Sequence, residues 1–337
     1  MENLKIIVCF LILIASACKS AGDDNEKYQR ERDNVINVAE KIVDVDTKIP
    51  VGPSQLYIID RFLIINEIIP QGDKGIHLFD KNTFEYITST GFQGRGPGEI
   101  TRPGGSIAID YSKNSFHVVD HGRRGVWEFS LNGILNDENY KPTKFKEMDP
   151  EMYPERFEFV NDSIALGMAI RPLSIDTYER VMVKLNLNTN TVNEFGYVHP
   201  EAVGEEVAHA RFAVCVDNGV YVKSYIRLDL ITICDLEGNL KYNVYGPGWS
   251  NDDNFRYFGH TSIINDKIIA SYTGGERAVF ENNRRVSNFP SQFLVFDLEG
   301  NYKYTIETGY RFISHSVVDE ENGRMICYFD GRENRVF

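Results

Sequence analysis

Residues 107–133, IAIDYSKNSFHVVDHGRRGVWEFSLNG, decide the fold of this 337-residue chain. One short apolar segment ends at Asp110, a second follows a polar turn, and a third precedes a turn-forming Leu-Asn-Gly. Short apolar segments rich in aromatic and β-branched residues, separated by Asp, Asn or Gly, are typical of antiparallel strands joined by tight turns. The stretch therefore predicts a series of consecutive strands.

The same arrangement recurs along the chain. Aspartates that end one apolar segment and precede another lie 49 to 55 residues apart, at Asp60, Asp110, Asp162, Asp217, Asp266 and Asp319. A second turn-forming marker follows the first five, near Thr83, Gly133, Asn190, Asn239 and Asn301. Four antiparallel strands in every ~45 to 50 residues is the pattern of a propeller blade. We therefore expect an all-β fold, a six-bladed β-propeller with four antiparallel strands per blade.

The sixth repeat reaches Phe337 without a fourth strand. Residues 35–46, VINVAEKIVDVD, have the apolar content to supply the missing outer strand. A ring closed by this N-terminal strand would leave no open sheet edge between the first and last blades. The segment also has acceptable helical spacing, so an N-terminal helix is the alternative.

Composition restricts the function classes. The chain is 42% hydrophobic and 25% charged, which excludes wholesale disorder and a polytopic membrane protein. A net charge of -13 argues against broad binding to nucleic acid or to an anionic membrane surface. The cysteines beyond the leader are Cys215, Cys234 and Cys327, and an odd number does not indicate a disulfide framework.

The N-terminal residues resemble an export signal. An apolar segment of about ten residues is too short to span a bilayer, and it ends in Ala-Ser-Ala before Cys18. This resembles the lipobox of bacterial lipoproteins, which implies a signal peptide over 1–17, lipidation of Cys18 and an outer-membrane anchor. A plain secretory signal or an uncleaved anchor is the alternative. We expect a flexible tether over 18–33 and the propeller over 34–337.

Acidic residues follow Cys18 in the tether, at Asp23, Asp24 and Glu26. They resemble the surface-export signal of one Gram-negative phylum, which implies the outer face of the outer membrane. A soluble linker on a periplasmic lipoprotein is the alternative. Both periplasmic and cell-surface orientations therefore stay open.

Two segments resemble known propellers. Residues 107–133 look like a blade of the NHL-type propellers, and GFQGRGPGEI over 91–100 resembles the Gly-x-Gly-Pro-Gly-Glu signature of the TolB-like six-bladed propeller lipoproteins of Gram-negative bacteria. The resemblance implies the fold, export and a binding role. It implies no particular activity, because propellers carry many functions.

The loops between repeats are expected to converge on one face of the ring. They carry candidate polar contacts and stacking surfaces, and basic residues also begin several inner strands: Arg95, Arg156, Tyr197, Arg211, Trp249, His260, Tyr310 and Arg311. Guanidinium groups pair with carboxylates or phosphates, and aromatic faces stack on sugar rings. We therefore expect a funnel that binds a small anionic or glycan ligand without catalysis. In the alternative, these side chains only brace neighbouring blades.

Two other functions stay open. A propeller enzyme, such as a glycan lyase, hydrolase or lactonase, would have Glu99 and His199 or His260 as acid and base candidates. A scaffold subunit of an outer-membrane uptake complex would instead bind an envelope protein. No cofactor or metal is expected; calcium is possible but nothing in the sequence indicates it. Contact with the membrane is expected through the lipid anchor alone.

Overall fold

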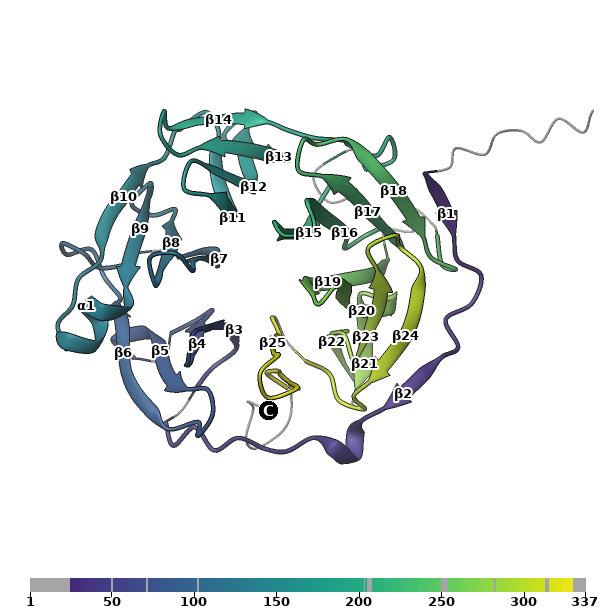
Figure 1. Ribbon diagram of the computed structural model, residues 1–337, viewed down its shortest axis with the longest axis horizontal. Helices are drawn as coiled ribbons and strands as arrows, with labels where there is room; N and C mark the ends of the chain where they lie inside the picture. Colours follow the sequence, from purple (N-terminus) through teal and green to yellow (C-terminus); the bar gives the residue numbers. More distant parts are fainter. Residues whose placement is uncertain are drawn as a thin grey trace, which may run out of the picture.

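The computed structural model describes residues 25–329, except 50, 71, 102, 203, 205–207, 250–253, 282 and 313–314. Its strands form a ring of antiparallel sheets around a central channel (Figure 1). The fold is an all-β propeller, and the described residues include one short helix, α1 (Leu131–Asn136), and one 3-10 turn. The predicted signal peptide and the lipidation site Cys18 lie outside the described residues.

Five blades have four antiparallel strands each. The first and second blades contain β3 (Ser54–Ile59), β4 (Phe62–Glu67), β5 (Lys74–Asp80), β6 (Tyr86–Phe92), β7 (Pro103–Asp110), β8 (Ser115–Asp120), β9 (Gly125–Ser130) and β10 (Thr143–Glu147). The third and fourth contain β11 (Tyr153–Asn161), β12 (Ile164–Pro172), β13 (Tyr178–Asn186), β14 (Thr191–Glu194), β15 (Ala210–Cys215), β16 (Val220–Tyr225), β17 (Leu230–Asp235) and β18 (Leu240–Tyr245). The fifth contains β19 (Phe255–Ile264), β20 (Lys267–Glu276), β23 (Gln292–Asp297) and β24 (Tyr302–Glu307).

The prediction of six four-stranded blades is wrong. The sixth Asp repeat forms a two-stranded hairpin, β25 (Val317–Asp319) and β26 (Arg324–Ile326), between the fifth and first blades. Each hairpin strand has only three residues, too short for a blade strand of the usual five or six. A recurring Asp turn marks one hairpin, and the turn at Asp319 marks the hairpin β25–β26.

The predicted closure of the ring by an N-terminal strand is also wrong. The segment 35–46 forms β2 (Val35–Asn37) and the 3-10 turn Ala39–Lys41, and β2 pairs in parallel with β24. It is therefore a fifth, outer strand of the fifth blade. Farther upstream, β1 (Glu26–Tyr28) pairs in parallel with β18 of the fourth blade. Residues 25–49, here called the strap, run along the outside of the ring in Figure 1.

Apolar side chains fill the spaces between neighbouring blades. The cluster between the first and second blades includes Ile64, Leu78, Phe116 and Phe129, all fully buried. Phe116 and Phe129 pair across β8 and β9 and stack with ring centroids 5.0 Å apart. Similar clusters join the third blade to the fourth and the fourth to the fifth. Burial of both faces of each sheet fixes the ring and the direction of the inner strands.

One insertion departs from a plain blade. Residues between β20 and β23, expected as a long loop, contain a second hairpin, β21 (Ala278–Glu281) and β22 (Arg284–Ser287). This hairpin lies at the same end of the blade as the connections between repeats. No helix in the described part of the chain combines the length and the apolar character that crossing a bilayer requires.

Candidate functional site: the central channel

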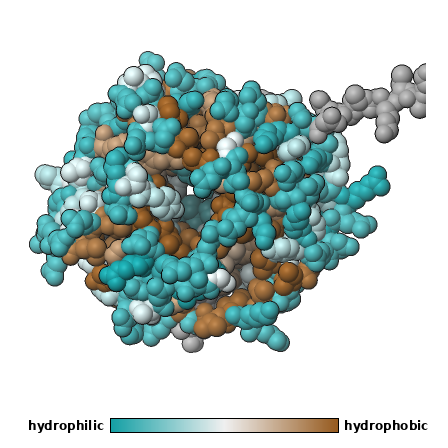
Figure 2. All heavy atoms as spheres, viewed as in Figure 1, coloured by the Kyte–Doolittle hydropathy of each residue, from teal (hydrophilic) through white to brown (hydrophobic). Residues whose placement is uncertain are grey.

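The central channel is a cavity of about 770 Å³. Its walls are the first strands of the five blades and the segment that leads into β25. The space-filling view is hollowed at its centre, where the channel opens (Figure 2). Because all the repeats contribute to one cavity, side chains from distant parts of the sequence converge there.

Two arginines enter the channel from adjacent strands. Arg156 is on β11 and Arg211 on β15, and both line the cavity. Arg156 is 6% exposed, donates to the carbonyl of Ala210 and lies over the ring of Phe212. Burial, and then repulsion by Arg211, lower the pKa of Arg156 to about 9, so it is still charged at neutral pH. Neither arginine forms an ion pair with any residue that the structure describes.

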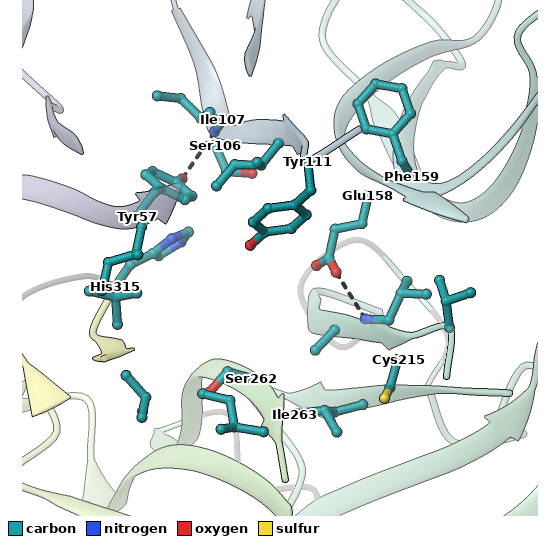
Figure 3. Close-up of a pocket in the computed structure, with 18 of the residues that line it drawn as sticks. Tyr57, Ser106, Ile107, Tyr111, Glu158, Phe159, Cys215, Ser262, Ile263 and His315 are labelled. Carbon is teal, nitrogen blue, oxygen red and sulfur yellow. Dashed lines mark hydrogen bonds between the residues drawn. The ribbon is translucent and has the colours of Figure 1, made fainter. Parts of the chain in front are cut away.

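Glu158 lies on the same face of β11, two residues beyond Arg156. Figure 3 shows its carboxylate in the cavity, where it accepts a hydrogen bond from the backbone N–H of Val214 at 2.9 Å. Burial raises the pKa of Glu158 to about 7, although the Val214 hydrogen bond and the Arg156 charge lower it. The side chain therefore changes charge close to neutral pH. This places a titrating carboxyl next to the two arginines.

Histidines from β19 and from the segment before β25 complete this layer. The rings of His260 and His315 stack with centroids 4.1 Å apart. Burial, and then repulsion by Arg211, lower the pKa of His260 to about 3, so the ring is neutral at pH 7. Tyr57 of β3 packs against His315 at 5.6 Å, and its hydroxyl accepts from the N–H of Ile107 at 3.0 Å. The positive charge of the layer therefore comes from the arginines.

The opposite end of the channel is acidic. It is formed by the Asp-bearing turns, and the cavity is lined there by Asp60, Asp110, Asp162, Asp217 and Asp319. Asp110 accepts from Ser112 and Lys113, and Asp319 accepts from Lys81 at 3.1 Å. Across the described ranges, no three His, Cys, Asp or Glu side chains are arranged to hold a metal ion. The charges therefore change sign along the channel, from arginine to aspartate.

The predicted candidates Arg95 and Glu99 lie in the loop after β6, outside the channel wall. The Glu99 carboxylate accepts from the N–H of Gly96 at 2.7 Å and lies 3.7 Å from Lys141. A Cβ on Gly94 or Gly96 would collide with this carboxylate. The Gly-x-Gly-Pro-Gly-Glu string is thus a turn stabilised by its own Glu99 carboxylate. Gly94 and Gly96 leave the space that this carboxylate occupies.

Three aromatic candidates form a separate cluster at the outer end of the fourth blade. His199 is 4% exposed and its Nε2 contacts the hydroxyl of Tyr245 at 2.9 Å, while Trp249 packs edge-on against both rings. Tyr197 bonds Asn243 of β18 through its hydroxyl at 3.1 Å. These residues pack beneath the strap, because Tyr28 stacks on Tyr245 at 4.5 Å. They do not line the channel.

Tyr310 and Arg311 follow β24, near the hairpin β21–β22. Tyr310 packs edge-on against Phe329, and Arg311 forms an ion pair with Glu281 of β21 at 2.5 Å. The place in the channel expected for Arg311 is taken by His315, four residues before Asp319. Of the predicted contacts, the structure brings together Arg156, Arg211 and His260.

Four residues that were not predicted as site residues also line the channel: Tyr57, Tyr111, Glu158 and His315. Glu158 could have been found, because a strand alternates its faces and the residue two positions after Arg156 shares its face. Tyr111 follows a marker Asp directly and points toward the channel centre in Figure 3. The sequence around His315 does not indicate a channel position in the same way. His315 precedes its marker Asp319 by four residues, whereas His260 precedes Asp266 by six.

No protein-family model matches the chain, and no curated protein matches it in sequence. Among solved structures, a member of the DUF4221 family from Bacteroides vulgatus is similar with a TM-score of 0.64 at 11% identity, over 87% of this chain and 93% of that one. This likeness supports the propeller fold. The resemblance to TolB-like and NHL-type proteins is confirmed only as far as that fold.

Two further structures are less similar. A Bacteroides fragilis protein named as exported has a TM-score of 0.49 at 12% identity, over 90% of this chain and 87% of that one. A gluconolactonase from Xanthomonas campestris also has a TM-score of 0.49 at 12% identity, and the likeness covers 79% of this chain and 78% of that one. Neither likeness is close enough to assign an activity.

Proposed function

We propose that this protein is a cell-envelope lipoprotein whose channel binds an anionic ligand, with carboxylates as the groups that Arg156 and Arg211 recognise. The single observation that supports it most is the pair of channel-facing guanidinium groups without an ion-pair partner in the described structure. Buried charge without a counterion is costly, and a bound anion would supply the counterion. Guanidinium groups bind carboxylates through two parallel hydrogen bonds.

The shape of the site fits a small ligand. A volume of about 770 Å³ lies within the range of ordinary ligand sites. Tyr57 and Tyr111 present aromatic rings to the cavity in Figure 3, which suits a sugar-like body between the charged groups. The preformed strands hold these side chains in place before binding. The envelope location and the TolB-like relationship rest on the leader and on the glycine-rich string.

Thermal unfolding with added anions tests the proposal. We expect galacturonate to raise the melting temperature, and galactose, its neutral counterpart, to leave it unchanged. Saturation at ~100 times the dissociation constant stabilises by about 2.7 kcal/mol. Arg211→Ala should abolish the shift, and this side chain has no hydrogen bond to lose within the described residues. An equal response to galactose, or a full response in Arg211→Ala, would contradict the proposal.

A further inference from the structure

We propose that the ligand is a chain-like acidic oligosaccharide, and that Arg256 forms a second anionic subsite at the mouth of the channel. This inference rests on the proposed function, since it extends the same site. It adds a subsite on the fifth blade that neither the motifs nor the comparisons indicate. Three consecutive inner strands, β11, β15 and β19, then each supply one arginine.

The position of Arg256 follows from the strand register. It is the second residue of β19, pairs with Gly275 of β20, and precedes His260 by four residues. The pairing of β19 with β20 shifts register twice over this stretch, between Arg256 and Phe258 and between Phe258 and Thr261. His260 lines the channel, so Arg256 lies along the same strand toward the end where the blades connect. That end is opposite the acidic turns.

The surroundings of Arg256 are rich in positive charge. The Arg227 guanidinium bonds the carbonyl of Phe255 at 3.4 Å, and the N–H of Arg277 bonds the carbonyl of Asn254 at 2.7 Å. Both segments therefore contact the start of β19. Burial, then repulsion by Arg227, Arg277 and Arg211, lower the pKa of Arg256.

Arg256 itself forms no ion pair or hydrogen bond with the described residues, and it is partly buried over the ring of Phe289. A partly buried arginine among like charges is a ready anion subsite. One small carboxylate at Arg156 and Arg211 would leave Arg256 unused. A ligand with carboxylates repeated along a sugar chain would satisfy both positions.

Affinity as a function of chain length tests this inference. Titration calorimetry would compare galacturonate with tetragalacturonate on the full chain and on Arg256→Ala. We expect the tetramer to bind the unaltered protein about tenfold more tightly, as one added charge-assisted contact predicts. Arg256→Ala should remove this tenfold gain and leave the affinity for the monomer unchanged. Lys267→Ala is the matched control, because it removes a positive charge from the opposite end of the same blade.

The outcomes separate the two proposals. If the monomer does not bind, or binds Arg211→Ala equally well, the proposed function and this extension both fail. If the monomer binds but the tetramer shows no gain, or if Arg256→Ala keeps the gain, only the second subsite is refuted. If tripolyphosphate binds more tightly than tetragalacturonate, the ligand is not an acidic sugar.

Discussion

Arg32 of the strap lies 3.0 Å from Asp229, Nη2 to Oδ1, and the two side chains are 9% and 0% exposed. Asp229 also accepts from the Tyr272 hydroxyl at 3.1 Å and from the N–H of Gly248 at 3.0 Å. The Arg32 guanidinium in turn lies 4.8 Å from the centre of the Tyr272 ring. One strap residue thus joins the fourth blade, which contributes Asp229, to the fifth, which contributes Tyr272.

Arg32→Ala should lower the free energy of unfolding by about 3 kcal/mol, because it leaves the Asp229 carboxylate buried without its counterion. The two remaining hydrogen bonds to Asp229 keep the loss at the lower end of the range for buried pairs. Urea unfolding measures the change. Arg30→Ala, an exposed change two residues away, is the control and should have little effect. Equal stability of Arg32→Ala and Arg30→Ala would show that the Arg32–Asp229 ion pair does not stabilise the fold.

The titration of Glu158 should make anion binding depend on pH. Its pKa is raised to about 7, so the carboxyl is neutral below pH 7 and negative above it. A negative charge beside Arg156 opposes a bound carboxylate, and we therefore expect galacturonate to bind more tightly at pH 6 than at pH 8. Calorimetry at both pH values measures the difference. Glu158→Gln should bind equally at both, whereas a retained pH dependence would assign it to another group.

The raised pKa of Glu158 also makes folding stability depend on pH, with the opposite sign to that of an ordinary ion-paired carboxylate. The folded pKa of Glu158 is above its usual value of 4.5, so the folded state binds the extra proton between these values. Its contribution to stability is complete below pH 4.5 and is lost as pH rises through 7. Glu158→Gln should remove this part of the fall in stability, which melting at pH 5 and pH 8 would show.

Periodicity predicted most of the fold, because each four-stranded blade is built from contacts local in sequence. The turn at Asp110 and the hairpins around it follow from apolar alternation and turn residues. The strap could not be predicted this way. Its pairing of Val35 with Thr305 depends on contacts 270 residues apart, which no local pattern encodes. The prediction of a sixth four-stranded blade was wrong because the Asp319 turn marks a hairpin and carries no information about outer strands.

The sequence could place a candidate side chain in the channel where its position within a strand decides which way it faces. Arg156 and Arg211 lie within inner strands, β11 and β15, and inner strands line a propeller channel, so their place followed from the repeat. Trp249 and His199 stand in connections between blades, whose path depends on packing against Tyr245 and the strap. Loop residues lack a period that would reveal which way they face. Their positions could therefore not be derived from the repeat, and the two side chains lie outside the channel.

Glu99→Gln distinguishes two roles for Glu99. The side chain either stabilises the glycine-rich loop or takes part in catalysis. The carboxylate accepts a bond from Gly96 N–H and contacts Lys141, outside the channel. We expect a loss of about 1 kcal/mol in unfolding free energy and no change in galacturonate affinity. Thermal unfolding and calorimetry measure the two quantities. A binding defect without loss of stability would instead bring Glu99 into the site.

Gly96→Ala is the companion change, since its Cβ would lie 2.7 Å from the Glu99 carboxylate. It should destabilise the loop at least as much as Glu99→Gln. Gly72→Ala is a suitable control, because a Cβ there meets no atom within 4 Å. If Gly96→Ala were as stable as Gly72→Ala, the carboxylate would not occupy the turn.

Cys215 should report ligand binding by its reactivity. It lines the channel and is partly exposed, while Cys234 and Cys327 are 0% and 4% exposed. Burial raises the pKa of the Cys327 thiol, which lowers its thiolate fraction further. Iodoacetamide should therefore modify Cys215 about tenfold faster than Cys327, measured by peptide mass spectrometry. Saturating galacturonate should slow the reaction at Cys215 and leave Cys327 unchanged, because only Cys215 shares the cavity with the arginines. If galacturonate raises the melting temperature but does not protect Cys215, the bound sugar does not reach the Asp-turn end of the channel, where Cys215 lies four residues beyond Arg211.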